Sequence, residues 1–407
     1  MPDDDATPPG PGNQGAGTPP GDQTPPTIMT RKELRAERAG SSSNTRWWIL
    51  GGVAVVLIGV VVALLVAGGS PAKKAAATTS TTHPVAAPTT CPLTGTPAPN
   101  GKVPARPALA VKIGNYTADR PSAGLNQADI VFEEPVEGTY TRLVAVFQCQ
   151  GANLVGDLRS ARQPDVAILS QLSNPIFLHA GGIDPVLALL AAAPIQDQNI
   201  LKGGYGSVTI NPSGRYAPYS TFTATTPAWA LVPSDTTPPA PLFTYSATPP
   251  AGSVPGSGAT VHIPFSSTSD VTWTWNASTG TYLRAYSGVP DKLLDGSQTA
   301  STNVVVLTVP TSTGPWLENN EGGYEVEVNA LGTGPAVVLR GGVAVTGTWT
   351  RSSLTQPATL KTANGTVITL APGNTWEELA PQGIPVTTTA SPATPATAGT
   401  TPPTTRP

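Results

Sequence analysis

The spacing of hydrophobic and polar positions predicts strands and helices in alternation over residues 107–193. Short apolar runs of strand length are separated by segments with helical spacing and helix-start residues. Strands are expected at 107–114, 128–134, 141–149 and 174–180, and helices at 122–129, 162–172 and 185–193. Pro185 suits the first position of its helix, since its missing N–H would have no partner there. This alternation favours an α/β-type lobe.

The pattern changes after residues 233–258, a stretch rich in Pro, Gly and Ser. Short apolar runs separated by turn residues then follow one another without helical segments, as is typical of an antiparallel β-rich lobe. The pair Asn364-Gly365 is the strongest hairpin signal. Strands are expected at 261–265, 271–275, 281–287, 303–309, 324–328, 336–342, 343–350 and 366–370.

Residues 47–67 are 21 consecutive uncharged and mostly apolar residues. As a helix they would extend about 31 Å, enough for one bilayer crossing. More Lys and Arg precede this segment than follow it, which predicts a cytoplasmic N-terminus and an extracytoplasmic remainder. A cleavable signal peptide is the alternative, although its apolar core should be shorter.

These patterns predict an α+β protein with one transmembrane helix, an extracytoplasmic α/β-type lobe and an antiparallel β-rich lobe. The lipid bilayer is then a partner of residues 47–67, in a bacterial cell membrane crossed once. The expected parts are a disordered cytoplasmic tail with a basic juxtamembrane segment (1–46), the helix (47–67), a linker (68–90), the two lobes (91–235 and 259–381) and a disordered tail (382–407).

Only 12% of the residues are charged, yet the run from Asp129 to Asp165 is rich in charge. Glu133, Glu134 and Glu137 could act as acid and base or hold a hard cation. Strand alternation would place Glu133 and Glu134 on opposite faces. The alternative is a solvated strand end, or a carboxylate paired with Arg142.

The segment RSAR, residues 159–162, lies just before an expected helix. Arg159 and Arg162 could clamp an anionic group with their forked donors, or could bridge the preceding glutamates and lock two elements together. Asp165 would lie in the first turn of the helix, where a carboxylate favours the helix dipole. No nucleophile-elbow motif surrounds Ser160.

Further candidates lie outside this run. His179 ends a strand before two glycines, where it could be a general base or a satisfied core histidine. Arg215 and Tyr219 lie in a loop and could face a ligand or pack the turn. The candidate ligand-binding residues are Asn126, Asp129, Glu133, Glu134, Glu137, Arg142, Arg159, Ser160, Arg162, Asp165, His179, Arg215 and Tyr219.

The two cysteines, Cys91 and Cys149, both fall on the predicted outer side, where a disulfide can persist; two free buried thiols are the alternative. No Cys or Cys/His cluster indicates a metal site, and no cofactor motif is present. The net charge of −3 and the absence of a basic stripe argue against nucleic-acid binding.

Five segments in order resemble the YerB-like lipoprotein family, named as domain of unknown function 3048: CPLTG (91–95), RPALAVKIGN (106–115), RPSAGLNQADIVFEEPVEGTYTRL (120–143), GDLRSAR (156–162) and the closing GTW with PGNTWEEL (347–379). The resemblance implies an envelope-exposed bacterial protein of uncharacterised biochemistry. Cys91 lies 23 residues past the apolar segment, so it is not a lipobox cysteine, and the transmembrane helix is expected to replace the lipid anchor.

The expected function is that of a membrane-anchored extracytoplasmic envelope protein that binds an anionic peptide or a cell-wall-derived ligand. One alternative is an envelope hydrolase that uses a Glu/His pair. Another is a structural partner of a second membrane protein, with the charged run as an internal ion network.

Overall fold

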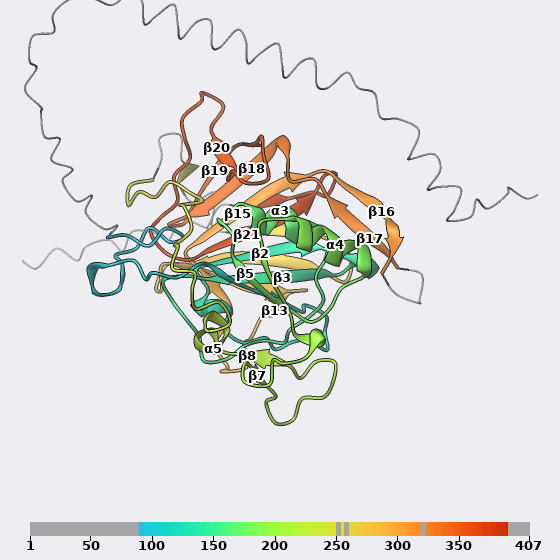
Figure 1. Cartoon of the computed structure of the whole chain (residues 1–407). Helices are drawn as coiled ribbons and strands as arrows, with labels where there is room; N and C mark the ends of the chain where they lie inside the picture. Colours follow the sequence, from blue (N-terminus) through green and yellow to red (C-terminus); the bar gives the residue numbers. More distant parts are fainter. Residues whose placement is uncertain (1–88, 250–253, 256–259, 319–322, 390–407) are drawn as a thin grey trace, which may run out of the picture. The chain divides into compact units, whose positions relative to one another are not determined.

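The computed structural model describes residues 89–249, 254–255, 260–318 and 323–389. Its main feature is one mixed sheet to which both the early and the late parts of the chain contribute strands (Figure 1). The eleven strands are β1 (Leu109–Ile113), β2 (Ile130–Pro135), β3 (Thr141–Phe147), β5 (Ile176–His179), β6 (Gln196–Asn199), β9 (Val254–Pro255), β15 (Asn303–Val309), β18 (Gly332–Arg340), β19 (Val343–Arg351), β20 (Thr359–Lys361) and β21 (Thr375–Pro381).

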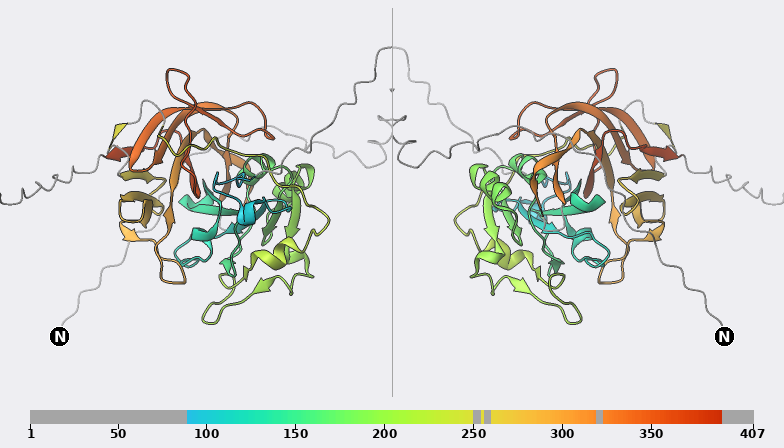
Figure 2. Two further views of the ribbon diagram at one scale, coloured as in Figure 1. Left: turned by 90° about the vertical axis from the view of Figure 1, so that its left-hand side faces the viewer. Right: turned by 90° about the vertical axis from the view of Figure 1, so that its right-hand side faces the viewer.

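The strand order joins the two parts at the centre of this sheet. It runs β20-β19-β18-β15-β21-β2-β3-β1-β5-β6, with β9 beside β19. The late strand β21 lies parallel to both β15 and the early strand β2. Figure 2 shows the same sheet from two other sides, with the strands of the early part continuing into those of the late part.

A smaller sheet of six strands covers one face of the large one. Its strands are β10 (Thr260–Pro264), β11 (Asp270–Asn276), β12 (Thr281–Tyr286), β13 (Val289–Pro290), β14 (Ala300–Ser301) and β22 (Thr387–Thr389). Trp273 of β11 packs edge-on against Trp376 of β21, with ring centroids 5.1 Å apart. The two sheets therefore share one apolar core.

Three α-helices occur in the described ranges: α3 (Pro164–Ser170), α4 (Asp184–Ala192) and α5 (Thr225–Trp229). Residues of α3 and α4 pack into the core on the other face of the large sheet. Burial on both faces explains why strands such as β3 are apolar at consecutive positions.

The remaining elements are short. A separate hairpin consists of β16 (Thr311–Leu317) and β17 (Tyr324–Val328), and a small three-stranded sheet consists of β4 (Val155–Gly156), β7 (Thr209–Ile210) and β8 (Phe222–Thr223). The 3-10 helices are η1 (Pro99–Gly101), η2 (Leu125–Gln127), η3 (Glu137–Thr139) and η4 (Ile200–Lys202).

This architecture corrects the predicted fold class. The described part is mostly β, and the expected α/β-type lobe and β-rich lobe share one sheet, because β21 pairs with β2 as well as with β15. The prediction of a single-pass transmembrane protein is also unsupported: no helix in the described part is long and apolar enough to cross a membrane. Residues 1–67, most of the linker and residues 390–407 lie outside the described residues. Within the predicted C-terminal tail, Thr387–Thr389 form β22 and pair with β10. The boundaries at 235 and 259 stay predictions.

Candidate functional site

Glu134 belongs to a fully buried ion cluster between the large sheet and α3. Lys112 of β1 contacts Glu134 of β2 and lies 2.8 Å from Asp165 of α3, and all three side chains are inaccessible to solvent. Burial and the nearby charge of Asp165 raise the pKa of Glu134 to about 8. Asp165 also accepts a hydrogen bond of 2.7 Å from the backbone N–H of Arg162, which fixes the start of α3.

Glu133 points to the opposite face, as strand alternation predicted. Arg284 of β12 donates to Glu133 over 2.7 Å and to Asp291 over 2.6 Å, so this ion pair links the two sheets. Thr141 and Asn115 complete the environment of the carboxylate, donating over 2.7 and 3.1 Å. Glu133 and Arg284 are fully buried.

Glu137 begins η3 and forms a two-point ion pair with Arg162. Nε of Arg162 donates to Glu137 over 2.7 Å, while Nη2 contacts the second carboxylate oxygen and lies 3.2 Å from Glu318. Arg142 lies 3.5 Å from Glu137 and donates to the Ser160 carbonyl over 2.9 Å. Burial would raise the pKa of Glu137, but the Arg162 hydrogen bond and the two arginine charges lower it to about 2.

We refer to these residues together as the buried ion network: Lys112, Glu133, Glu134, Glu137, Arg142, Arg162, Asp165 and Arg284. Lys112 and Arg284 were not among the predicted residues. Lys112 interrupts an otherwise apolar strand, and Arg284 lies in a later strand with no sequence link to Glu133. The lysine within an apolar strand can be read from the sequence, whereas the pairing of Arg284 with Glu133 cannot.

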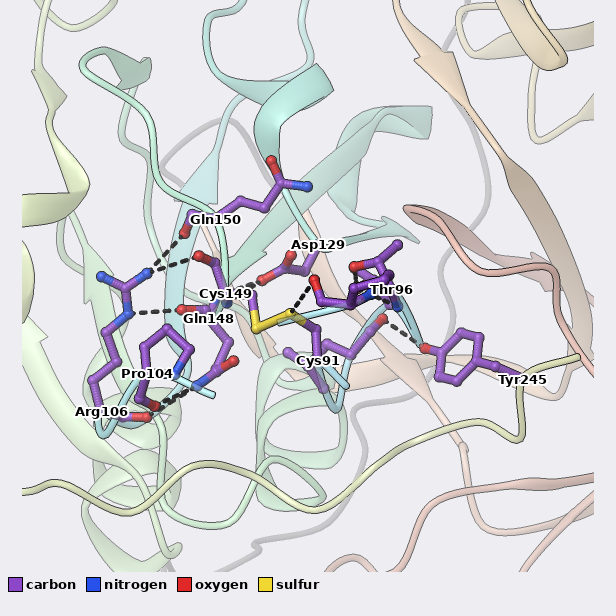
Figure 3. The surroundings of a disulfide bond; sticks show 12 residues. Cys91, Thr96, Pro104, Arg106, Asp129, Gln148, Cys149, Gln150 and Tyr245 are labelled. Carbon is purple, nitrogen blue, oxygen red and sulfur yellow. Dashed lines mark hydrogen bonds between the residues drawn. A yellow bond between two sulfur atoms is a disulfide. The ribbon is translucent and has the colours of Figure 1, made fainter. Parts of the chain in front are cut away.

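Asp129 lies beside the predicted disulfide, which is confirmed: Cys91 and Cys149 are bonded (Figure 3). The Asp129 carboxylate accepts hydrogen bonds from the backbone N–H groups of Gln148 and Cys149. Burial nevertheless raises the pKa of Asp129 to about 7. This carboxylate therefore fixes the end of β3 next to the disulfide.

Asn126 and His179 are also held within the fold. The Asn126 amide donates to the Gln298 carbonyl over 3.0 Å and accepts from the Ala300 N–H over 2.9 Å. The His179 ring is fully buried, with one nitrogen 2.8 Å from the Gly181 carbonyl and the other 2.6 Å from Asp197. Neither ring nitrogen is open to a substrate in this arrangement.

Four predicted residues keep accessible side chains and lie near one another: Arg159, Ser160, Arg215 and Tyr219. The Arg159 guanidinium lies 5.1 Å from the ring of Tyr219 and 5.9 Å from the ring of Tyr116. Its contacts within the described residues are a 3.3 Å hydrogen bond to the Pro218 carbonyl and a 3.5 Å ion pair with Asp119. We call Tyr116, Arg159, Ser160, Arg215 and Tyr219 the Arg159 surface.

Two buried aspartates support this surface from below. Arg215 donates over 3.0 Å to the Tyr219 carbonyl and lies 3.8 Å from Asp157. Burial and the nearby Asp119 carboxyl raise the pKa of Asp157 to about 8. The raised pKa of Asp157 favours its neutral form, which offers Arg215 little counter-charge, whereas Arg159 keeps its ion pair with Asp119.

The described ranges contain no group of three or more His, Cys, Asp or Glu residues that could hold a metal ion. The arrangement at the Arg159 surface, which joins guanidinium groups with tyrosine rings, is suited to bind a carboxylate or phosphate on a larger body.

Three comparisons with known proteins place the chain in a family. Residues 93–237 match the N-terminal domain and residues 261–376 the C-terminal domain of the family described as “Protein of unknown function (DUF3048)”. The Bacillus subtilis protein named “Putative lipoprotein YerB” is 44% identical over 90 residues, which are 22% of this chain and 27% of that protein.

The crystal structure of the YerB protein from Bacillus subtilis has a similar fold, with a TM-score of 0.62 and 22% sequence identity. The match covers 72% of this chain and 96% of that one. The predicted resemblance is thereby confirmed: the chain belongs to the DUF3048 family of proteins of unknown function.

Proposed function

We propose that the protein is a membrane-associated, extracytoplasmic protein of the cell envelope that binds an anionic ligand at the Arg159 surface. The name of the Bacillus subtilis relative, “Putative lipoprotein YerB”, supports the location. The Cys91–Cys149 disulfide supports it independently, because disulfides persist in oxidising compartments outside the cytoplasm.

The observation that carries the binding function is the state of Arg159. Arg142 and Arg162 are buried and each lies against Glu137, whereas Arg159 is partly accessible and lies near two tyrosine rings. A guanidinium held in this way can form two parallel hydrogen bonds to a carboxylate or phosphate. The tyrosines offer apolar faces to the body of the same ligand. Soluble cell-wall fragments, which carry sugars, peptides and carboxylates, combine these features.

Binding of soluble cell-wall fragments to the full-length protein tests this function. Calorimetric titration should give saturable binding, and Arg159→Ala should weaken it by about 10-fold or more, since a charged hydrogen bond is worth about 1.5–3 kcal/mol. Lys202→Ala is the matched control: Lys202 is an exposed cation, with 63% of its side chain accessible, outside this surface. Absence of binding, or equal loss in both variants, would rule the proposal out.

A further inference from the structure

A second feature, separate from the Arg159 surface, is an open cavity of about 680 Å³ beside the β12–β13 turn. Its walls include Arg120 and Pro121 from the loop before η2, Tyr140 just before β3, Tyr286 at the end of β12, and Lys292 just after β13. None of these residues belongs to the buried ion network. The cavity combines two cationic side chains with tyrosine rings and an aliphatic rim.

Arg120 is the central group of this cavity. Its guanidinium carbon lies 3.5 Å from the centroid of the Tyr286 ring, so the guanidinium is stacked on the tyrosine. The Tyr286 hydroxyl donates to the Thr268 carbonyl over 2.9 Å and lies 2.8 Å from the Ser269 hydroxyl, which fixes the ring. Within the described part of the chain, the Arg120 side chain makes no hydrogen bond and no ion pair. A stacked guanidinium keeps its N–H donors in one plane, and here these donors have no protein acceptor.

The other charged groups of the cavity leave it positive. Asp291 also lines the wall, and its carboxylate lies 2.6 Å from the buried Arg284, which it shares with Glu133, so the two cations of the cavity face one partly compensated carboxylate. Lys292 is exposed and forms no ion pair with any described residue. An entering anion would therefore meet two unpaired cations. A forked guanidinium with an ammonium nearby fits the two oxygens of a carboxylate or the oxygens of a phosphate.

The aliphatic residues at the rim of the cavity indicate which kind of group carries the anion. Pro121, Val289 and Pro290 line the same cavity, and 66% of Val289 is exposed. These aliphatic groups can cover a small apolar body next to the anion. Tyr140 also lines the cavity, and its ring centroid is 4.1 Å from that of Tyr116, so the cavity adjoins the Arg159 surface.

We propose that this cavity is a second binding site, for an oxyanion carried by a small apolar group. Arg120 donates two parallel hydrogen bonds to the anion, and Lys292 adds a second positive charge. The oxyanion is a carboxylate or a phosphate, since both present the same pair of oxygens to a guanidinium. The site rests on Arg120, Tyr286 and Lys292 and does not depend on the function proposed for Arg159.

The test is calorimetric titration of the full-length protein with three probes: N-acetyl-alanyl-alanine with a free carboxylate, the same dipeptide as its carboxamide, and inorganic phosphate. The carboxylate should bind about 10-fold or more tightly than the carboxamide, because the charged hydrogen bonds are lost in the amide. Arg120→Gln should abolish this preference, and Arg120→Lys, which keeps the charge but not the fork, should retain part of it. If phosphate binds and also depends on Arg120, the site is supported and the anion is a phosphate.

Two controls separate the outcomes. Thermal unfolding of each variant shows whether it is folded, and Arg120→Lys remains informative if Arg120→Gln is not. Lys202→Ala, at an exposed cation outside both sites, should leave binding of these small probes unchanged. The readout is the dependence on Arg120, so failure of the function proposed for Arg159 would not affect the result. Equal binding of carboxylate and carboxamide with no binding of phosphate, or unchanged binding in folded Arg120→Gln, would overturn the inference.

Discussion

The buried ion network and the Arg159 surface come from the same run of sequence but have opposite physical characters. In the network each arginine or lysine faces carboxylates that no solvent reaches, as in Lys112 between Glu134 and Asp165. At the surface Arg159 is partly accessible and has one weak carboxylate contact, at 3.5 Å. Arg162, three residues later, is paired at both ends of its guanidinium. Neighbouring charged residues of one motif can therefore differ in role: Arg162 stabilises the fold, whereas Arg159 is accessible to a ligand.

The largest effect should come from removing the cation at the centre of the network. Lys112→Met would remove the counter-charge of the buried Asp165 and the hydrogen-bond donor of the buried Glu134, and we expect a loss of about 3–5 kcal/mol in the free energy of unfolding, or no folded protein at all. Urea unfolding at pH 7 measures it. Lys202→Met, at an exposed position, is the control and should change stability by about 0.5 kcal/mol or less. A Lys112→Met variant as stable as the wild type would show that the buried ion network does not stabilise the fold.

A smaller, pH-dependent effect is expected for Glu137. Its pKa in the folded protein, about 2, lies below its ordinary value of 4.5, so the charged form stabilises the fold. The stabilisation of about 3 kcal/mol is complete above about pH 5 and is lost as the pH falls through 4.5 towards 2. Glu137→Gln should therefore be less stable than the wild type at pH 7, with a gap that narrows at pH 3. Denaturant unfolding at both pH values decides this; a gap independent of pH would mean that the charge of Glu137 contributes nothing.

The smallest effect on stability should come from Arg159→Ala, which we expect to change the free energy of unfolding by about 1 kcal/mol or less, since its ion pair is long and partly solvated. The same urea experiment applies. A loss comparable with that of Lys112→Met would place Arg159 in the network and remove the contrast between the two regions.

Much of the local structure could be predicted, because strand-length apolar runs in this chain do form strands. The runs at 128–134 and 141–149 correspond to β2 and β3, and the helix expected at 185–193 corresponds to α4. The expected strand at 366–370 is wrong: Val367 and Leu370 make only isolated bridges. The turn at Asn364-Gly365 is present, and the chain after it stays bonded to β20, through the Lys361–Val367 bridge and the Ile368 N–H, without forming a regular strand.

The strand β21 was missed, although it is central to the fold. Its sequence TWEELAP places Glu377 and Glu378 among the apolar residues, and so lacks the pattern of a buried strand. Both glutamates are nevertheless buried, and Trp273 donates to Glu378 over 2.7 Å. Burial and the adjacent Glu133 raise the pKa of Glu378 well above its ordinary range. Partners from distant segments make such a strand possible, and a local pattern cannot show them.

The same limit applies to the candidate residues. The candidate ligand-binding residues predicted from the sequence include members of both the buried ion network and the Arg159 surface. The charge of a residue does not show whether its side chain forms a buried ion pair. Arg284, which pairs with Glu133, is 151 positions away in the sequence. Arg120, which has no such partner in the described part of the chain, was not singled out.

The place of β21 between β2 and β15 has a consequence for the order of events during synthesis. Strands β2 and β3 are made early, yet the neighbour that pairs with the free side of β2 is residues 375–381. Until those residues leave the ribosome, β2 has an open edge of the kind that pairs with foreign strands. Contacts of such long sequence separation also slow folding. A chain cut short before residue 375 would therefore be more prone to aggregate than to form a smaller stable domain.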